Sequence, residues 1–157
     1  MTKNNIIKLD AGFESFDLEF KGLPERMKIS FVATDYRLAA HFKQMQNAVS
    51  EKLQEAPDFD IDDNGMPDGA EYIQYMNELD NFVCEQLDRC FGIPISKELF
   101  KYCSPFAIIN GERYVTQVII RLAEVIQQAT ERQRREEMKK FKEKMQHMKP
   151  HLEKYAK

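Results

Sequence analysis

Three stretches of the chain repeat apolar residues at steps of three and four, the spacing that gathers side chains on one side of a helix. The strongest runs from Ala70 to Phe91, and Gly92 followed by Pro94 provides its stop. The other two are Asp35 to Leu53 and Glu112 to Ala129. Because each apolar stripe needs partners, we expect these three helices to form one core around the 70–91 helix.

Local signals place the ends and the core residues of the helices. Thr34 suits the N-cap of the first helix, and Ser96 suits the N-cap of a short helix over Lys97–Cys103. On the 70–91 helix we expect Phe82 to lie in the core. A charge at that position should then unfold the domain, since an unpaired charge in an apolar core is costly.

Alternation of apolar and charged residues predicts strands near the N-terminus. The alternation covers Phe16–Lys21 and resumes over Met27–Phe31, with turn-forming residues at 22–25 between them. This pattern predicts an antiparallel hairpin whose apolar face packs on helices, because two strands alone are marginal in water. A short strand is also possible at Ile6–Leu9. The expected fold class is α+β and predominantly helical, with an N-terminal β-hairpin packed on a helical body and a long charged C-terminal helix.

The composition indicates one domain with an appended tail. A length of 157 residues, 43% of them hydrophobic, suits one ordinary core. We expect a hairpin element at 1–33, a helical body at 34–130 that forms one domain with it and carries an acidic loop at 58–69, and a charged helical tail at 131–157. The tail holds ten Lys/Arg against five Glu, a net of +5, which leaves −8 for the rest of the chain.

Apolar residues of the tail follow the a/d rhythm of a coiled coil, at steps of 3, 4, 3, 4 and 3. We name them the seam: Met138, Phe141, Met145, Met148, Leu152 and Tyr155. The seam predicts a coiled coil with a second copy of the chain, or a surface for another protein's helix, and methionine suits an adaptable interface. It could instead fold back on the body. Pro150 should break or kink the helix before its last turn.

Positive charge in the tail raises a nucleic-acid alternative. Seven Lys/Arg lie between Arg132 and Lys144, interleaved with Glu, and no aromatic platform or recognised nucleic-acid motif accompanies them. This pattern favours a solvated helix laced with i,i+4 ion pairs. Nucleic acid is therefore an unlikely partner, although a nucleic-acid-binding regulator stays as an alternative.

A segment that runs from the acidic loop into the start of the next helix, 60–71, satisfies the pattern D-x-[DN]-x-[DN]-G-x5-E and resembles the calcium loop of EF-hands. Calcium is therefore a possible cofactor, and a calcium-binding interaction module is an alternative function. Pro67 departs from the EF-hand pattern, and no second hand is present. An acidic linker that favours the start of the next helix is the other interpretation. The ligands that the resemblance implies are Asp60, Asp62, Asn64, Met66, Asp68 and Glu71.

No catalytic pattern is found in the sequence. The three histidines have no Ser or Cys partner in a known motif, and a glycine-rich phosphate loop is missing. Cys84, Cys90 and Cys103 form no CxxC pair, so buried reduced thiols are expected. No apolar run reaches the roughly 18 residues of a membrane span, and residues 1–12 lack the apolar core of a signal peptide. We expect a non-enzymatic cytoplasmic protein.

The layout resembles a known family. A small hairpin and a helical body are followed by the passage from Leu79 to Tyr102, in which a helix leads through Phe91-Gly92 into a short helix, and then by a long helix with a charged tail. This arrangement resembles the small tail assembly chaperones of long-tailed phages of Gram-positive hosts. The resemblance implies a non-enzymatic protein that binds the tape-measure protein, keeps it soluble and recruits tail-tube subunits in the host cytoplasm. It also implies self-association.

Overall fold

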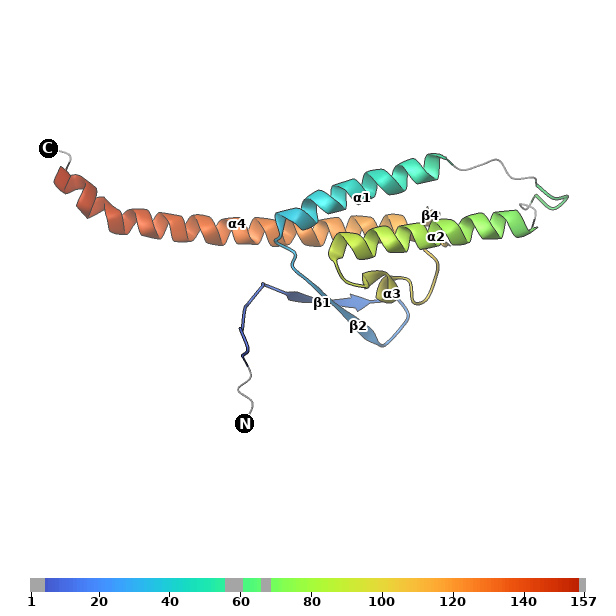
Figure 1. Ribbon diagram of the computed structural model, residues 1–157, viewed down its shortest axis with the longest axis horizontal. Coiled ribbons are helices and arrows are strands. Elements are labelled where there is room, and N and C mark those ends of the chain that lie inside the picture. Colours follow the sequence, from blue (N-terminus) through green and yellow to red (C-terminus); the bar gives the residue numbers. More distant parts are fainter. Residues whose placement is uncertain (1–4, 56–60, 66–68, 156–157) are drawn as a thin grey trace.

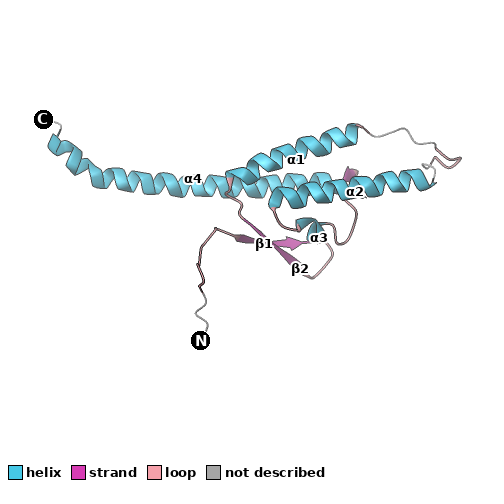
Figure 2. Ribbon diagram, in the orientation of Figure 1, coloured by secondary structure: helices cyan, strands magenta, loops and turns pink. Residues whose placement is uncertain are grey.

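The computed structural model describes residues 5–55, 61–65 and 69–155, with the backbone alone for 149–155. Helices make up most of it, and the fold class is α+β and predominantly helical, as predicted (Figures 1 and 2). The elements in chain order are β1 (Glu14–Glu19), β2 (Arg26–Phe31), α1 (Tyr36–Gln54), α2 (Gly69–Phe91), α3 (Ile95–Leu99), β3 (Ile108–Ile109), β4 (Glu112–Arg113) and α4 (Tyr114–Tyr155).

The predicted N-terminal hairpin is confirmed, with its apolar face on the helices. β1 and β2 pair antiparallel, with Glu14 opposite Phe31. Ile29 and Phe31 are buried, and the Phe16 ring stacks on the Phe31 ring with centroids 4.8 Å apart. Phe31 also meets Phe91 of α2 edge to face, with centroids 4.9 Å apart. These aromatic contacts hold the hairpin against the end of α2.

The possible strand at Ile6–Leu9 is not formed. The side chains of Ile6, Ile7 and Leu9 are 66%, 85% and 87% exposed. In the described part of the chain, the sheets pair β1 with β2 and β3 with β4, and neither sheet includes this stretch. A strand needs a neighbour for its backbone hydrogen bonds, and a short apolar run does not supply one by itself.

One core joins α1, α2 and the first half of α4, as the apolar stripes predict. The hairpin closes this core on one side, and Figure 1 shows the three helices running along one another. The most deeply buried side chain of α2 is Leu87, which is 0% exposed. The buried residues of the three helices are Leu38, Phe42, Met45 and Val49, then Leu79, Val83, Leu87 and Cys90, and finally Val115, Val118, Leu122, Ile126 and Ala129.

Phe82 is not a full core residue, contrary to the expectation from the sequence. Its side chain is partly buried, while its neighbour Val83 is 1% exposed and faces the core. The Lys52 ammonium of α1 lies 5.7 Å from the centroid of the Phe82 ring. Phe82 therefore lies at the rim between α1 and α2, within reach of a positive charge.

The helix ends agree with the sequence in one case and differ in another. Asp35, and not Thr34, caps α1: its carboxylate accepts the backbone N–H of Arg37 at 3.0 Å. At the end of α2, Gly92 has a φ of +70°, and its N–H donates to the carbonyl of Asp88 at 2.9 Å. The predicted glycine stop is thus confirmed, because the left-handed conformation is open to glycine at little cost.

Ser96 does not act as an N-cap, because it lies inside α3. Pro94 precedes α3, which ends at Leu99 and does not reach the predicted Cys103. The Ser96 backbone N–H and its hydroxyl both donate to the carboxylate of Asp88, at 2.8 and 2.9 Å. Asp88, in the last turn of α2, thus supplies the acceptor that satisfies the start of α3, as a capping residue would.

The long helix α4 begins at Tyr114, later than the predicted Glu112. Glu112–Arg113 pair instead with Ile108–Ile109 in a minimal antiparallel hairpin. The turn residues Asn110 and Gly111 both have positive φ, 51° and 81°. Positive φ at both central positions is typical of the tight turn that Asn-Gly favours between two strands. The turn signal was visible in the sequence, but the strand pairing that delays the helix was not.

Candidate functional site

The C-terminal half of α4 extends well beyond the body (Figure 1). The helix continues through Pro150 to Tyr155, so of the two expected effects, a break or a kink, the break does not occur. Figure 1 shows a bend in α4 near its C-terminal end. A proline removes one backbone hydrogen bond and bends a helix without ending it where solvent leaves room for its ring.

The seam is exposed along its described length. Burial ends at Ala129, which is 3% exposed, and every described side chain from 131 to 148 is exposed. Met138, Phe141, Met145 and Met148 are 50%, 56%, 44% and 52% exposed, so these four do not fold back on the body. Leu152 and Tyr155 lie on the helix, but their side chains are outside the described ones. A continuous apolar stripe left in water marks a place where another molecule binds.

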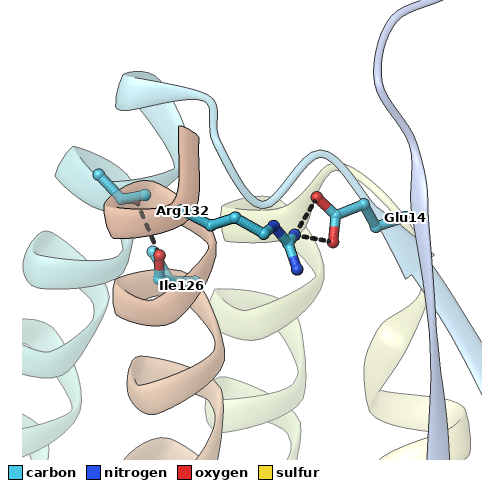
Figure 3. A network of polar contacts seen from close by, with 4 residues as sticks. Glu14, Ile126 and Arg132 are labelled. Carbon is cyan, nitrogen blue, oxygen red and sulfur yellow. Dashed lines mark hydrogen bonds and ion pairs between the residues drawn. The ribbon is translucent and has the colours of Figure 1, made fainter. Parts of the chain in front are cut away.

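An ion pair fixes the base of the tail against the hairpin. One guanidinium nitrogen of Arg132 donates to both carboxylate oxygens of Glu14 in β1, each at 2.8 Å (Figure 3). Two residues earlier, the Thr130 hydroxyl donates to the Ile126 carbonyl at 2.8 Å. The Arg132 side chain is 56% exposed and that of Glu14 is 29% exposed. The pair orients the start of the tail and adds little stability, since solvent screens it.

Among the described side chains of the tail, residues 131–148, the expected i,i+4 ion pairs are not formed. Along residues 131–148, the contact between Arg132 and Glu14 is the one ion pair that the structure shows. Glu136 and Lys140 have the right spacing, but their side chains extend into solvent. Holding two long side chains together costs conformational entropy, and the attraction in water barely offsets it. The remaining lysines of the tail therefore carry charge without a partner among the described residues.

A groove lies between α1 and α4 at the base of the tail. Its volume is about 510 Å³. The groove could not be predicted from the sequence, because its walls come from two helices that are far apart in the chain. The one available signal was that small and polar residues recur on the facing sides of both helices. It is lined by Ala39, Phe42, Lys43 and Gln46 of α1, and by Ala123, Ile126, Gln127, Thr130, Glu131 and Arg134 of α4.

A second groove lies between the hairpin and α4, with a volume of about 420 Å³. Apolar and aromatic side chains make up much of its wall, among them Leu18, Phe20 and Tyr102. Phe20 meets Tyr102 edge to face, with ring centroids 5.1 Å apart. The alternation over Phe16–Lys21 puts Phe20 on the apolar face of the hairpin, but it gives no sign of this groove, which depends on how the hairpin sits against α4.

Half of the calcium ligands implied by the EF-hand resemblance lie outside the described residues, namely Asp60, Met66 and Asp68. Within the described part, a carboxylate oxygen of Asp62 accepts the N–H of Asn64 at 2.9 Å. Gly65 has a φ of +78°, so it makes the turn that the pattern requires of this glycine. Glu71 is exposed in the first turn of α2.

Among the described residues, no three His, Cys, Asp or Glu side chains gather closely enough to hold a metal ion. Calcium binding stays a prediction, and titration separates its two interpretations. An acidic linker is expected to give no saturable heat with calcium or magnesium in isothermal titration calorimetry. A saturable calcium heat that is weak with magnesium and lost in Glu71→Gln would instead establish a calcium site, because Glu71 supplies the bidentate carboxylate in that geometry.

The three cysteines are free thiols. Cys90 is buried, as expected, whereas Cys84 and Cys103 are only partly buried. Burial raises the pKa of the Cys90 thiol to about 11 and also raises the pKa of the Cys84 and Cys103 thiols. All three are therefore protonated at neutral pH, and the reactive thiolate form is scarce.

No family model, curated protein or solved structure matches the chain. In the described part of the chain, none of the helices combines the length and the apolar character that a membrane crossing requires. The exposed seam on α4, continued by the groove beside α1, is the surface feature that a function has to explain.

Proposed function

We propose that this protein is a non-enzymatic assembly chaperone that holds a helical segment of another protein along its C-terminal helix. The exposed seam is the observation that supports this function. Its four described residues keep a/d register on a helix that leaves the body. Covering apolar surface is favourable by about 25 cal/mol per Å², and flexible methionine side chains adapt to partners of different shape.

The family resemblance suggests which protein is held. The small tail assembly chaperones of long-tailed phages bind the tape-measure protein, keep it soluble and recruit tail-tube subunits in the host cytoplasm. We extend that role to this chain, with the tape-measure protein as the helical partner and without a cofactor. The passage from Leu79 to Tyr102, which carries the resemblance, forms the end of α2, the Gly92 stop and α3.

Co-expression with a candidate tape-measure protein tests the proposal. The parent chain is expected to keep the partner soluble and to co-purify with it. Phe141→Glu combined with Met145→Glu should abolish both effects, because it places charge at the centre of the seam. Gln133→Glu combined with Gln146→Glu is the matched control: it also adds two glutamates in place of uncharged residues, but on exposed positions away from the seam. This control should behave as the parent does.

Circular dichroism of each variant shows whether the tail stays helical, so that a loss of binding can be assigned to the seam. If the Phe141→Glu, Met145→Glu variant remained helical and still held the partner, the seam would not be the binding surface. Tight binding of duplex DNA that weakens steeply with salt, measured by gel shift, would favour the nucleic-acid alternative.

A further inference from the structure

The residues beside the seam are mostly basic. In a coiled-coil arrangement, the positions directly before and after the a/d pair flank the apolar stripe and face the partner helix. On the described part of the tail, Arg135, Lys142 and Lys144 occupy such flanking positions, with Glu137 as the exception. All four side chains are exposed. The partner's flanks would therefore meet predominantly positive charge.

The acidic residues are placed differently. Glu136 and Glu143 occupy the position opposite the seam, on the far side of the helix. Residues 131–148 hold seven Lys/Arg against four Glu, a net of +3. Three of these seven basic residues thus flank the apolar stripe, and two of the four glutamates lie on the opposite side of the helix.

The flanking charges have no acidic partner within the described chain. Among residues 131–148, Arg132 at the base of the tail is the one that forms an ion pair. Lys142 and Lys144 lie beyond the body, where Figure 1 shows α4 extending alone. A carboxylate on a bound helix would consequently gain a charged partner without displacing an existing one.

A second copy of the tail that runs antiparallel is a poor occupant of the seam. In an antiparallel pair centred between Phe141 and Met145, Lys142 would face Lys142 of the other copy, and Lys144 would face Lys144 of the other copy. Like charges at these positions oppose pairing. The positive net charge of each tail adds a longer-range repulsion that only high salt would screen.

A lipid surface or a nucleic acid would also be a poor match for the narrow apolar stripe of the seam. A helix that lies in a membrane interface buries a broad apolar face, whereas the seam has only the two positions per heptad of a coiled-coil stripe. A nucleic acid would neutralise the lysines but leave Phe141 and the methionines in water. A narrow apolar stripe with charged flanks fits another helix best.

The groove between α1 and α4 continues the same face of α4 toward the body. Its α4 wall includes Gln127, Thr130 and Arg134, and Arg134 lies one turn before Met138. From Ala123 to Met148 this face is about 37 Å long, at roughly 1.5 Å per helical residue. A helix along the seam would thus run its end into the groove beside Phe42.

We propose that the seam and this groove together bind an amphipathic helix of another protein whose apolar stripe is flanked by Asp or Glu. This inference rests on the proposed function and adds to it the chemistry of the segment that is held. Such a helix would cover the seam, pair its carboxylates with Arg135, Lys142 and Lys144, and have a length of about 25 residues.

Two designed helical peptides of about 25 residues test the inference. Both carry leucine at the a and d positions, and they differ in having glutamate or lysine at the flanking positions. Fluorescence anisotropy with the full chain is expected to show at least about tenfold tighter binding of the glutamate-flanked peptide. The preference should shrink as salt is added.

Charge reversal of the chain is the complementary arm. Lys142→Glu combined with Lys144→Glu is expected to reverse the preference between the two peptides. Lys139→Glu combined with Lys140→Glu changes the net charge equally, but at positions away from the flanks, and should keep the preference of the parent.

The outcomes distinguish this inference from the proposed function. Equal binding of both peptides that is lost in Phe141→Glu, Met145→Glu would overturn the charge inference and leave the helix-binding function standing. Failure to bind either peptide would count against both the charge inference and the helix-binding function. Self-association of the chain alone, removed by Phe141→Glu with Met145→Glu in sedimentation velocity, would make a second copy the occupant. The charge inference would also be overturned if the chain bound phosphatidylglycerol vesicles or duplex DNA more tightly than the glutamate-flanked peptide.

Discussion

Leu87→Asp is expected to unfold the body. The Leu87 side chain, near the C-terminal end of α2, is 0% exposed, and the hairpin, α1 and α4 contribute to the same core. A carboxylate there would have neither water nor a cationic partner, and burying an unpaired charge costs several kcal/mol. A domain of this size is stabilised by about 5–15 kcal/mol, so the loss takes up much or all of that free energy of unfolding.

Phe82→Asp, on the same helix, is expected to destabilise the body without unfolding it. Phe82 is only partly buried, and the Lys52 ammonium lies 5.7 Å from its ring. An aspartate at 82 would reach both water and Lys52. The change removes apolar burial and the cation–π contact, for a loss of about 1–3 kcal/mol. This revises the sequence-based expectation that a charge at position 82 unfolds the domain.

Thermal and urea denaturation followed by circular dichroism measure both effects. Glu85→Gln, on the exposed side of the same helix, serves as the control and should melt with the parent. An unchanged melting temperature for Leu87→Asp would contradict the central place of α2 in the core. Equal destabilisation by Leu87→Asp and Phe82→Asp would show that the rim between α1 and α2 is more deeply buried from solvent than the structure indicates.

Truncation after Thr130 is expected to leave the body folded and to abolish association through the tail. Burial ends at Ala129, so the truncation removes no side chain of the core. It does remove the ion pair between Arg132 and Glu14, and an exposed pair of this kind contributes at most about 1 kcal/mol. The body should therefore melt within a few degrees of the parent.

Light scattering of the parent, the truncated chain and the Phe141→Glu, Met145→Glu variant, each alone and with a co-expressed candidate partner, decides the matter. Glu14→Gln in the parent isolates the loss of the ion pair and should change stability as little as the truncation does. If the truncated body unfolds, the tail belongs to the core after all. If it stays folded with association unchanged, the binding surface lies elsewhere on the molecule.

The sequence by itself determined the elements that depend on neighbours along the chain. Apolar spacing of three and four residues identified the three helices, and strict alternation identified the hairpin, because each periodicity matches one backbone geometry. The stop at Gly92 followed from the positive φ that glycine adopts easily. The a/d register of the seam was equally legible. These features need no knowledge of which distant segment lies alongside.

The tertiary structure alone decided the features that depend on distant partners. Ile6–Leu9 had the composition of a strand but no neighbour to pair with, and Ser96 found its acceptor in Asp88 of the preceding helix. Arg132, read from the sequence as one of a row of solvated charges, meets Glu14 across more than a hundred residues of chain. Whether an apolar stripe is core or surface is likewise a matter of what lies opposite it. The stripe of α4 is covered up to Ala129 by helices of the body and left in water beyond, where no element of the described chain follows it.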